Sequence, residues 1–575
     1  MRVAMRPRRR LAIARLFFIP VLVLGVGLGV GVNLSLGAGA SPSDDPLLAL
    51  HRDFWAFRIA QQPMSRDDIP RVERPASWVP RWSSTDVAGF RERLADFERR
   101  YSALEKPTGP HARRVDHQLV GAMIARVRWE MEVTEGYRRS PQFYLDQTLG
   151  ALVDALLPPP PFGRQRSADV LARLSAFPRA LEEGKTNLDD ARAPFARLAL
   201  ADLEGIGPRL RAAMADLRPR LEASAGRDLA RVTDEAVRAL EAFQAWLKAR
   251  LPALGTATAV GREGYQWFLE NVALVPFTPE ELLAMGRQEW ERAVSFESLE
   301  KARNRGLPEM PLFKDQAAQA AAEAAAESTV RRFLAEKGLL TIPEHMPHYV
   351  YRSVPGYLRH LAGFGEWSEF TSPTRLTEDS TRYIPEPGPG LGYFSSSMAK
   401  DPRPIIVHEG VPGHFAQLWL SWNHENEIRR RYTDSGPSEG IGFYAEEMLL
   451  QAGLFDDAPK TREVLYNFMR LRALRVEVDV KLATGTFTID EAADYLTRTV
   501  PMDARTAGEE AALFASTPGQ AITYQIGKLQ ALRFLAEARR TQGDAFDLRA
   551  FHDFVWKNGN VPIALQQAEY LSSVP

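Results

Sequence analysis

The sequence predicts a mainly α-helical protein that carries one small antiparallel sheet. Over most of the chain, apolar residues recur every three or four positions with charged residues between them, a pattern typical of amphipathic helices. The exception is the stretch 341–400, which is rich in Pro, Gly, Thr, Ser and Tyr and contains short β-prone pieces. We therefore expect strands and loops within about 341–400 and helices on both sides of it.

The bulk composition is that of an ordinary globular protein. The chain has 575 residues, of which 45% are hydrophobic and 25% are charged, so it is long enough for more than one lobe. Its 72 basic and 73 acidic residues give a formal net charge of -1. Because this balance lacks the basic excess typical of nucleic-acid-binding proteins, we expect no nucleic-acid partner.

Cysteine is absent from the chain. This absence excludes disulfide bonds, cysteine-based metal sites, thiol nucleophiles and a lipoprotein anchor, which needs a cysteine for its attachment. A metal ion would therefore have to be bound by histidine and carboxylate side chains, and the chain has only 10 His.

Residues 1–40 have the features of an export segment. Residues 1–15 contain several arginines and no acidic residue, an apolar run follows, and the run ends at Ala38-Gly39-Ala40. This order is typical of a cleaved signal peptide. Because the apolar run is long, an uncleaved inner-membrane anchor over 16–36 is the alternative. Both interpretations place the protein in the periplasm or outside the cell, with the membrane contacted only through this segment.

Residues 41–260 are predicted to form an N-terminal helical scaffold. Clear amphipathic patterns run over 85–104 and 227–251, and a Pro-rich cluster at 158–163 separates neighbouring helices. This part of the chain contains no motif that indicates catalysis, so we expect it to support the rest of the protein.

Residues 261–575 are predicted to form the catalytic region. A helix begins at Thr278, with a proline in its first turn and two glutamates following. Strands are expected at 348–352 and 392–396. The second strand could pair with an extended substrate, and Tyr393 on it is a candidate substrate-binding residue.

The chemical motif lies in the segment 405–420, which brings His408, Glu409 and His414 close together in sequence. A catalytic zinc is bound by three protein ligands, for which imidazole is a common choice, and keeps one position for water. A glutamate beside a ligand can take a proton from the attacking water. A single histidine in an apolar helix is more often a buried core residue, but this combination favours a metal site.

The spacing of the two histidines requires a break in the helix. The H-E-x-x-H pattern places its histidines four residues apart on one helix face, whereas His414 lies six residues after His408. On a continuous helix six residues turn by about 600°, so the two side chains would point to different sides. Pro412 and Gly413 favour a break or bulge between them. Such a break would let both histidines bind one ion.

A third ligand is expected on the next helix, predicted over 435–453 with a serine as its cap. Glu439 lies in the first turn of this helix and is the preferred ligand. Glu446 and Glu447 on the same helix are the alternatives.

A second group of polar residues lies on the predicted helix 517–540. Gln520, Tyr524 and Lys528 are spaced by four residues and share one face. A tyrosine hydroxyl can donate to the oxyanion of a tetrahedral intermediate, and Lys528 or Gln520 could bind a substrate terminus. The alternative is a polar stripe that faces solvent.

Three segments resemble one known family. HEGVPGHFAQ (408–417), SEGIGFYAEEM (438–448) and PGQAITYQIGKLQ (518–530) are similar to motif blocks of the bacterial family called domain of unknown function 885. The likeness extends over about residues 50–570. That family is similar to thimet oligopeptidase and angiotensin-converting enzyme, which are helical, prolate zinc peptidases with a deep cleft and a small sheet beside the metal.

The resemblance implies a prolate, metallopeptidase-like fold with a deep cleft and the sheet near the metal site. It implies one Zn²⁺ per chain, with His408, His414 and Glu439 as ligands, Glu409 as the base and Tyr524 as a transition-state donor. The chain departs from the family pattern at two positions, since Phe415 replaces a second histidine and Ile441 replaces a tryptophan. The first departure leaves His414 as the ligand choice in its block.

We therefore expect zinc-dependent hydrolysis of peptides outside the cytoplasm, by an oligopeptidase or a carboxypeptidase-like enzyme. One alternative is a metal-dependent hydrolase of a non-peptide amide or ester, which would use the same ligands. Another is a catalytically idle binding protein of the same fold. Glu409 argues against the idle protein, because a scaffold does not need an acid beside a ligand. Substrate length and oligomeric state are open.

Overall fold

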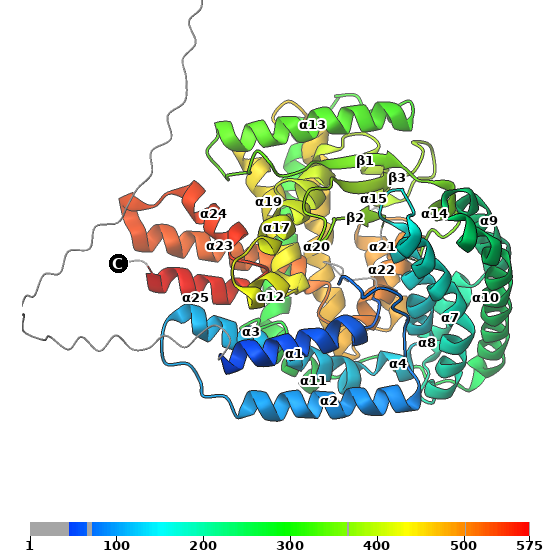
Figure 1. Ribbon diagram of the computed structural model, residues 1–575. Coiled ribbons are helices and arrows are strands. Elements are labelled where there is room, and N and C mark those ends of the chain that lie inside the picture. The colour runs from blue at the N-terminus through cyan, green and yellow to red at the C-terminus, as the bar shows by residue number, and fades with distance from the viewer. Residues whose placement is uncertain (1–44, 66–71, 365–366, 501, 574–575) are drawn as a thin grey trace, which may run out of the picture. The chain divides into compact units, whose positions relative to one another are not determined.

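The computed structural model describes residues 45–65, 72–364, 367–500 and 502–573 (Figure 1). Pro46–Pro575 forms one compact unit. The expected export segment, residues 1–40 with the apolar run at 16–36, lies outside the described residues. Within the described ranges, no helix combines the length and the apolar character needed to cross a membrane.

The N-terminal part of the unit consists of helices, as its periodicity predicts. They are α1 (Pro46–Gln61), α2 (Ser84–Ser102), α3 (His111–Arg128), η1 (Trp129–Thr134), α4 (Gly136–Arg139), α5 (Pro141–Leu145), η2 (Asp146–Gly150), α6 (Ala151–Leu156), α7 (Arg164–Asn187), α8 (Ala193–Asp202), α9 (Ile206–Leu217), η3 (Arg218–Arg220), α10 (Ala223–Arg250), η4 (Leu251–Ala253) and α11 (Arg262–Asn271). The helix expected at 85–104 is α2, and the helix expected at 227–251 is α10, which packs along α7.

The C-terminal part is also mainly helical. Its helices are α12 (Pro279–Arg303), α13 (Gln316–Glu336), α14 (Gly356–Arg359), α15 (Tyr393–Met398), α16 (Arg403–Ile405), η5 (Ile406–Gly410), α17 (His414–Trp422), α18 (Glu427–Arg431), α19 (Ser435–Ala452), α20 (Pro459–Thr484), α21 (Ile489–Thr499), α22 (Ala504–Ser516), α23 (Ile522–Gln542), η6 (Gly543–Ala545), α24 (Leu548–Lys557) and α25 (Ile563–Ser573). Thr278 caps α12 in a reciprocal capping box with Glu281, as the sequence predicts. The predicted mainly α class is confirmed.

The sheet has three strands and is mixed, so the prediction of an antiparallel sheet is wrong. β1 (Tyr349–Ser353) pairs parallel with β3 (Ser380–Ile384), and the two-residue strand β2 (Ser368–Glu369) pairs antiparallel with β3. The strand expected at 348–352 is β1. Between β1 and β3 the chain passes through α14 and β2, and this connection brings β3 back in the same direction as β1.

The free edge of β1 is covered by α13, which lies along the sheet in Figure 1. The buried carboxylate of Glu323 on α13 accepts a hydrogen bond from the backbone N–H of Tyr351, with an N–O distance of 3.0 Å. Because α13 covers this edge, a further strand or an extended peptide cannot pair with β1 there.

The second expected strand, at 392–396, is a helix. The segment forms α15, with Gly392 at its start. A run of serines has no β-branched residue to favour a strand, and the rings of Tyr393 and Phe394 pack on Phe468 of α20. The proposed backbone pairing of a substrate with this segment is therefore wrong.

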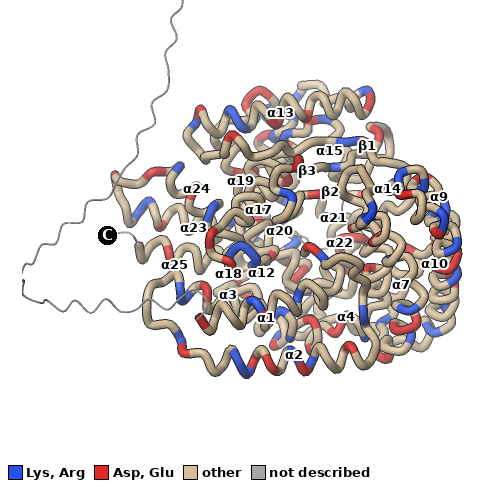
Figure 2. The backbone as a smooth tube through the Cα atoms, viewed as in Figure 1, with Lys and Arg blue, Asp and Glu red and all other residues tan. Residues whose placement is uncertain are grey.

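Four hydrophobic clusters fill the unit. The largest draws mainly on the helices before residue 260, and the second surrounds η5, α17, α19 and α23. Figure 2 shows basic and acidic residues interspersed along the helices, in keeping with the near-zero net charge. The boundary between 41–260 and 261–575 stays a prediction, since both belong to the one compact unit.

Candidate metal centre

The helix that carries the two histidines is broken between them. The π-helical turn η5 ends at Gly410, Val411 has extended backbone angles (φ -122°, ψ 124°), and α17 begins at His414. The Val411–Pro412 peptide bond is cis. The break predicted from the Pro-Gly pair is confirmed, and it directs both imidazoles to the same place.

Gly413 is required where the chain turns into α17. A Cβ atom added to it would lie 1.8 Å from the carbonyl oxygen of His408, which is closer than any real contact. The backbone of Gly413, after the break, therefore packs directly against the backbone of His408, before it.

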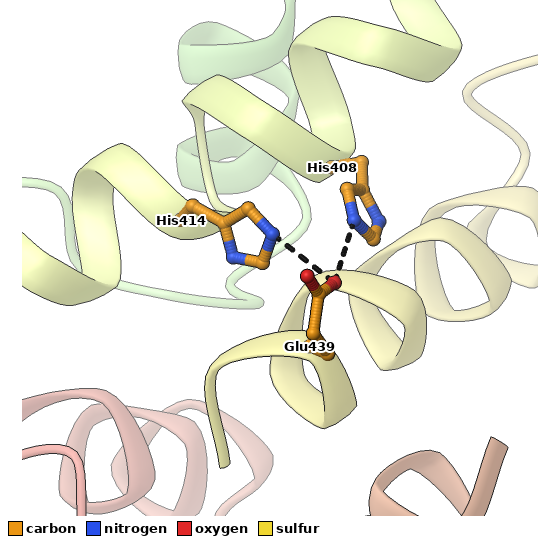
Figure 3. A group of neighbouring side chains, drawn as sticks. All are labelled: His408, His414 and Glu439. Atoms are coloured by element: carbon orange, nitrogen blue, oxygen red, sulfur yellow. Dashed lines mark hydrogen bonds and ion pairs between the residues drawn. The ribbon is translucent and has the colours of Figure 1, made fainter. Parts of the chain in front are cut away.

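His408, His414 and Glu439 converge (Figure 3). Oε2 of Glu439 lies 3.1 Å from Nε2 of His408 and 3.3 Å from Nε2 of His414. The imidazole ring centroids are 4.7 Å apart, and all three side chains are buried. The three nominated ligands therefore share one small volume.

Glu439 is presented by the first turns of α19. The cap of this helix is Asp434, whose side chain accepts from Gly436 N, so the expectation of a serine cap is wrong. Gly453 ends the helix with a positive φ of 97°. Asp434 outcompetes the serines because its carboxylate is also held by Arg126 of α3, a partner far away in sequence.

Gly442 makes room for both imidazoles. A Cβ atom at this position would lie 3.1 Å from Cε1 of His414 and 3.2 Å from Cε1 of His408. The histidine rings thus rest against the bare backbone of α19, one turn after Glu439.

A pair of glycines, Gly440 and Gly527, brings α23 against α19. A Cβ atom on Gly440 would lie 2.6 Å from the Cα atom of Gly527. Such an approach is possible only without side chains. It places Tyr524 of α23 beside the histidine–glutamate group, with its ring nearly parallel to that of His408 at a centroid distance of 6.1 Å.

The other nitrogen of His408 is held by a carboxylate. Nδ1 lies 2.7 Å from Oε1 of Glu446, and Arg472 of α20 contacts the same oxygen at 2.8 Å. With a carboxylate beside Nδ1, Nε2 is the nitrogen that faces Glu439 and could bind a metal. Glu446, an alternative third ligand in the sequence prediction, instead contacts the opposite side of the His408 ring.

The charge balance of the group favours a cation. Burial and the Arg472 charge lower the pKa of His408, but Glu439 and Glu446 outweigh them and hold it above its ordinary value. Burial raises the pKa of Glu439, but the two imidazoles hold it well below its usual range. Without another cation the carboxylates therefore favour an imidazolium, and a metal ion would take the place of that proton.

The donor geometry fits zinc. Ligand atoms at about 2.0–2.1 Å from a tetrahedral zinc are about 3.3 Å apart. The two histidine–glutamate distances, 3.1 and 3.3 Å, match this separation. Two imidazoles and one carboxylate are also the donor types of catalytic zinc sites that keep a position for water.

Glu409 follows His408 in η5, and its side chain is partly exposed. Nη1 of Arg382, on the central strand β3, lies 3.4 Å from Oε1 of Glu409. Arg382 therefore places a positive charge beside Glu409, the predicted base. The position of this carboxylate thus depends on β3.

The approach of Tyr524 depends on a buried carboxylate. Asp479 of α20 accepts from the backbone N–H groups of Gly519 and Ala521 at 2.9 and 2.6 Å, and so fixes the turn that begins α23. Burial and the Glu439 charge raise the pKa of Tyr524 well above its ordinary value. Its hydroxyl is therefore a protonated hydrogen-bond donor at neutral pH.

The remaining nominated residues lie apart from the three candidate ligands. Gln520 precedes α23 and lines a cavity, whereas Nζ of Lys528 is buried and pairs with Glu447 at 2.7 Å and Glu289 at 3.2 Å. Lys528 is therefore not free to bind a substrate carboxylate. The hydroxyl of Tyr393 donates to Asn467, so it is held by α20.

Three further histidines make contacts of other kinds. Nδ1 of His424 accepts from Asn426 N, the ring of His345 packs on Trp419, and His348 pairs with Glu327. Phe415 and Ile441, the two departures from the family pattern, are fully buried core residues.

Sequence reasoning missed Arg382, Arg472 and Asp479, because their partners lie on elements far away in the chain. It considered Glu446 only as a ligand. The spacing could have identified its true place, since Glu446 lies two helical turns after Glu439 and therefore on the same face of α19.

Comparisons with known proteins give a family and a shared fold. A family model described as a bacterial protein of unknown function, DUF885, matches residues 79–569. A candidate lipoprotein of unknown function from Shewanella oneidensis matches with a TM-score of 0.69 at 16% identity, over 92% of this chain and 100% of its own. A candidate lipoprotein from Colwellia psychrerythraea matches with a TM-score of 0.72 at 16% identity, over 92% of this chain and 100% of its own. No curated protein matches the chain.

Proposed function

The chain belongs to the bacterial protein family of unknown function DUF885, and we propose that it is a zinc-dependent peptide hydrolase. The observation that carries the proposal is the convergence of His408, His414 and Glu439 at the spacing of zinc ligands. The carboxylate at Nδ1 of His408 supports it, because such second contacts accompany metal-bound histidines.

In this proposal His408, His414 and Glu439 hold the zinc, which acidifies water and polarises a carbonyl group when bound. Glu409, kept in place by Arg382, takes a proton from the attacking water and later passes it to the leaving amine. The neutral hydroxyl of Tyr524 donates a hydrogen bond to the developing oxyanion.

We further propose that the protein acts outside the cytoplasm. The proposal rests on the export features of residues 1–40, and the two similar structures are described as candidate lipoproteins. Export with cleavage, or anchoring through 16–36, would give the same location.

The test combines metal content and turnover. We expect elemental analysis of the purified protein to give about one zinc per chain, as three ligands and one open position would bind. On a library of short peptides, Glu409→Gln should lose nearly all turnover and keep its zinc. Glu425→Gln, which changes an exposed acid between α17 and α18, is the matched control and should keep both.

Each alternative has its own outcome. Zinc without turnover of any peptide would favour hydrolysis of another amide or ester. Absence of zinc, with no activity after zinc is added, would favour an idle binding protein. Loss of zinc together with activity in Glu409→Gln would make Glu409 a ligand instead of the base.

A further inference from the structure

A cavity of about 260 Å³ lies between the N-terminal helices and the C-terminal region. Its walls come from α1, α3, α8 and α11 on one side and from the segment before α19 and the end of α22 on the other. The N-terminal helices, whose sequence contains no motif that indicates catalysis, thus form one wall of this cavity.

The cavity comes close to the candidate metal centre along two helices, α19 and α23. Ser435, which lines it, lies four residues before Glu439 on α19, about 6 Å along the helix and close to the same face. Thr523 also lines it and directly precedes Tyr524 on α23. The three candidate ligands are not among its lining residues, so we expect a ligand in the cavity to lie beside the metal and not on it.

Aromatic side chains from both halves of the chain line the cavity. Among them are Phe54, Trp129, Phe195, Phe268 and Tyr432. These side chains are almost fully buried and make part of the lining apolar, which favours an aromatic or branched aliphatic group over a polar one.

The charges of the lining are balanced within the protein. Each arginine among the described lining residues has a carboxylate partner: Arg58 pairs with Glu130 at 2.6 Å, Arg126 with Asp434 at 2.6 Å, and Arg431 with Glu427 at 2.7 Å. An acidic ligand group would therefore meet no available arginine in this lining.

We infer that this cavity is the substrate subsite beside the scissile bond and that it takes an uncharged aromatic or branched aliphatic side chain. The inference rests on the proposed function and names the specificity of the same site. The volume is close to the lower end, about 300 Å³, of small-molecule sites. Such a space suits a short extended peptide, and a folded protein domain would not fit.

The test uses two arginine substitutions on α8. Leu198 is half-buried and lines the cavity, whereas Leu200, also half-buried, packs against the N-terminal core and does not line it. The probes are pentapeptides Ala-Ala-Xaa-Ala-Ala in which Xaa is Phe, Leu or Glu. Cleavage is measured as kcat/KM, and binding is measured by calorimetry on zinc-loaded Glu409→Gln protein.

The unmodified protein should prefer the Phe and Leu peptides over the Glu peptide by about tenfold or more. Leu198→Arg should lower kcat/KM and affinity for the Phe peptide about tenfold and raise both for the Glu peptide, because it adds an unpaired cation. Leu200→Arg should change neither. Equal behaviour of the two variants, or equal acceptance of Phe and Glu, would overturn the subsite while leaving the zinc hydrolase intact.

The two proposals can fail separately. If the protein holds no zinc and cleaves nothing, the proposed hydrolysis fails. Calorimetry of the Phe peptide on the unmodified chain then decides the subsite, since binding weakened by Leu198→Arg supports it and absence of binding overturns it.

Discussion

Nδ1 of His408 lies 2.7 Å from Oε1 of Glu446, while Nε2 of the same ring lies 3.1 Å from Glu439. The imidazole therefore bridges two carboxylates of one helix, α19. Arg472 contacts the same carboxylate at 2.8 Å and so helps to hold it beside Nδ1, which leaves Nε2 as the nitrogen that faces Glu439 and the candidate metal position.

Glu446→Gln should weaken zinc binding about 10- to 100-fold, because the amide orients the ring less strongly and lowers its basicity. The dissociation constant is measured by competition with a chromogenic chelator. Glu447→Gln is the matched control on the neighbouring residue, whose carboxylate pairs with Lys528 and Arg292. It should cost stability and leave zinc affinity unchanged. Equal zinc affinity in both variants would contradict an orienting role for Glu446.

Gly442→Ala should reduce zinc affinity, because the new methyl group would press on both imidazoles at about 3.1 Å. In an unobstructed helix the same change would stabilise by about 1 kcal/mol. Gly440→Ala meets the backbone of Gly527 instead and should lower the melting temperature of the metal-free protein. If Gly442→Ala binds zinc as tightly as the unmodified chain, the rings do not rest on α19 as described.

Tyr524→Phe should lower kcat about 10²- to 10³-fold with little change in KM or zinc content, as expected for the loss of one oxyanion donor. The ring that stacks beside His408 is retained, so the change removes only the hydroxyl. The measurement is steady-state kinetics on a peptide that the unmodified protein is found to cleave in the library test. A rise in KM at constant kcat would assign Tyr524 to ground-state binding.

Glu323 should make the metal-free protein less stable as the pH rises. Burial raises the pKa of Glu323 to about 7, although Tyr351 N lowers it through a hydrogen bond. Between its unfolded pKa, about 4.3, and about 7, the native state holds a proton that the unfolded chain has lost. The free energy of unfolding therefore falls with pH, by at most about 1.4 kcal/mol per unit for this group.

Glu323→Gln should remove this part of the slope, because the neutral amide can still accept from Tyr351 N. Urea denaturation in the presence of a chelator, at several values between about pH 5 and about pH 8, compares the two proteins. Parallel stability curves would show that Glu323 is ionised in the native state throughout this range.

The local features of the fold could be predicted from the sequence. Thr278 and Glu281 cap α12 through neighbours in the chain, and the break at Pro412-Gly413 follows from the chemistry of these two residues. Once this break is assumed, the convergence of the His408 and His414 side chains can be predicted as well.

Features that depend on distant partners could not be predicted. The direction of β3 is set by its pairing with β1, and the helix at Tyr393 is stabilised by packing on Phe468. The burial of Lys528 depends on Glu289, which lies more than two hundred residues earlier. Periodicity and spacing report on one segment at a time, so they do not reveal these contacts.

The contact of Gly440 with Gly527 has a mechanical consequence. At this crossing the two backbones touch with no side chain between them, so α19 and α23 cannot move closer together there. Glu439 lies one residue before Gly440, and Tyr524 lies three residues before Gly527, so both are close to this contact along their helices. We therefore expect the separation of these two side chains to change little when the surrounding helices move.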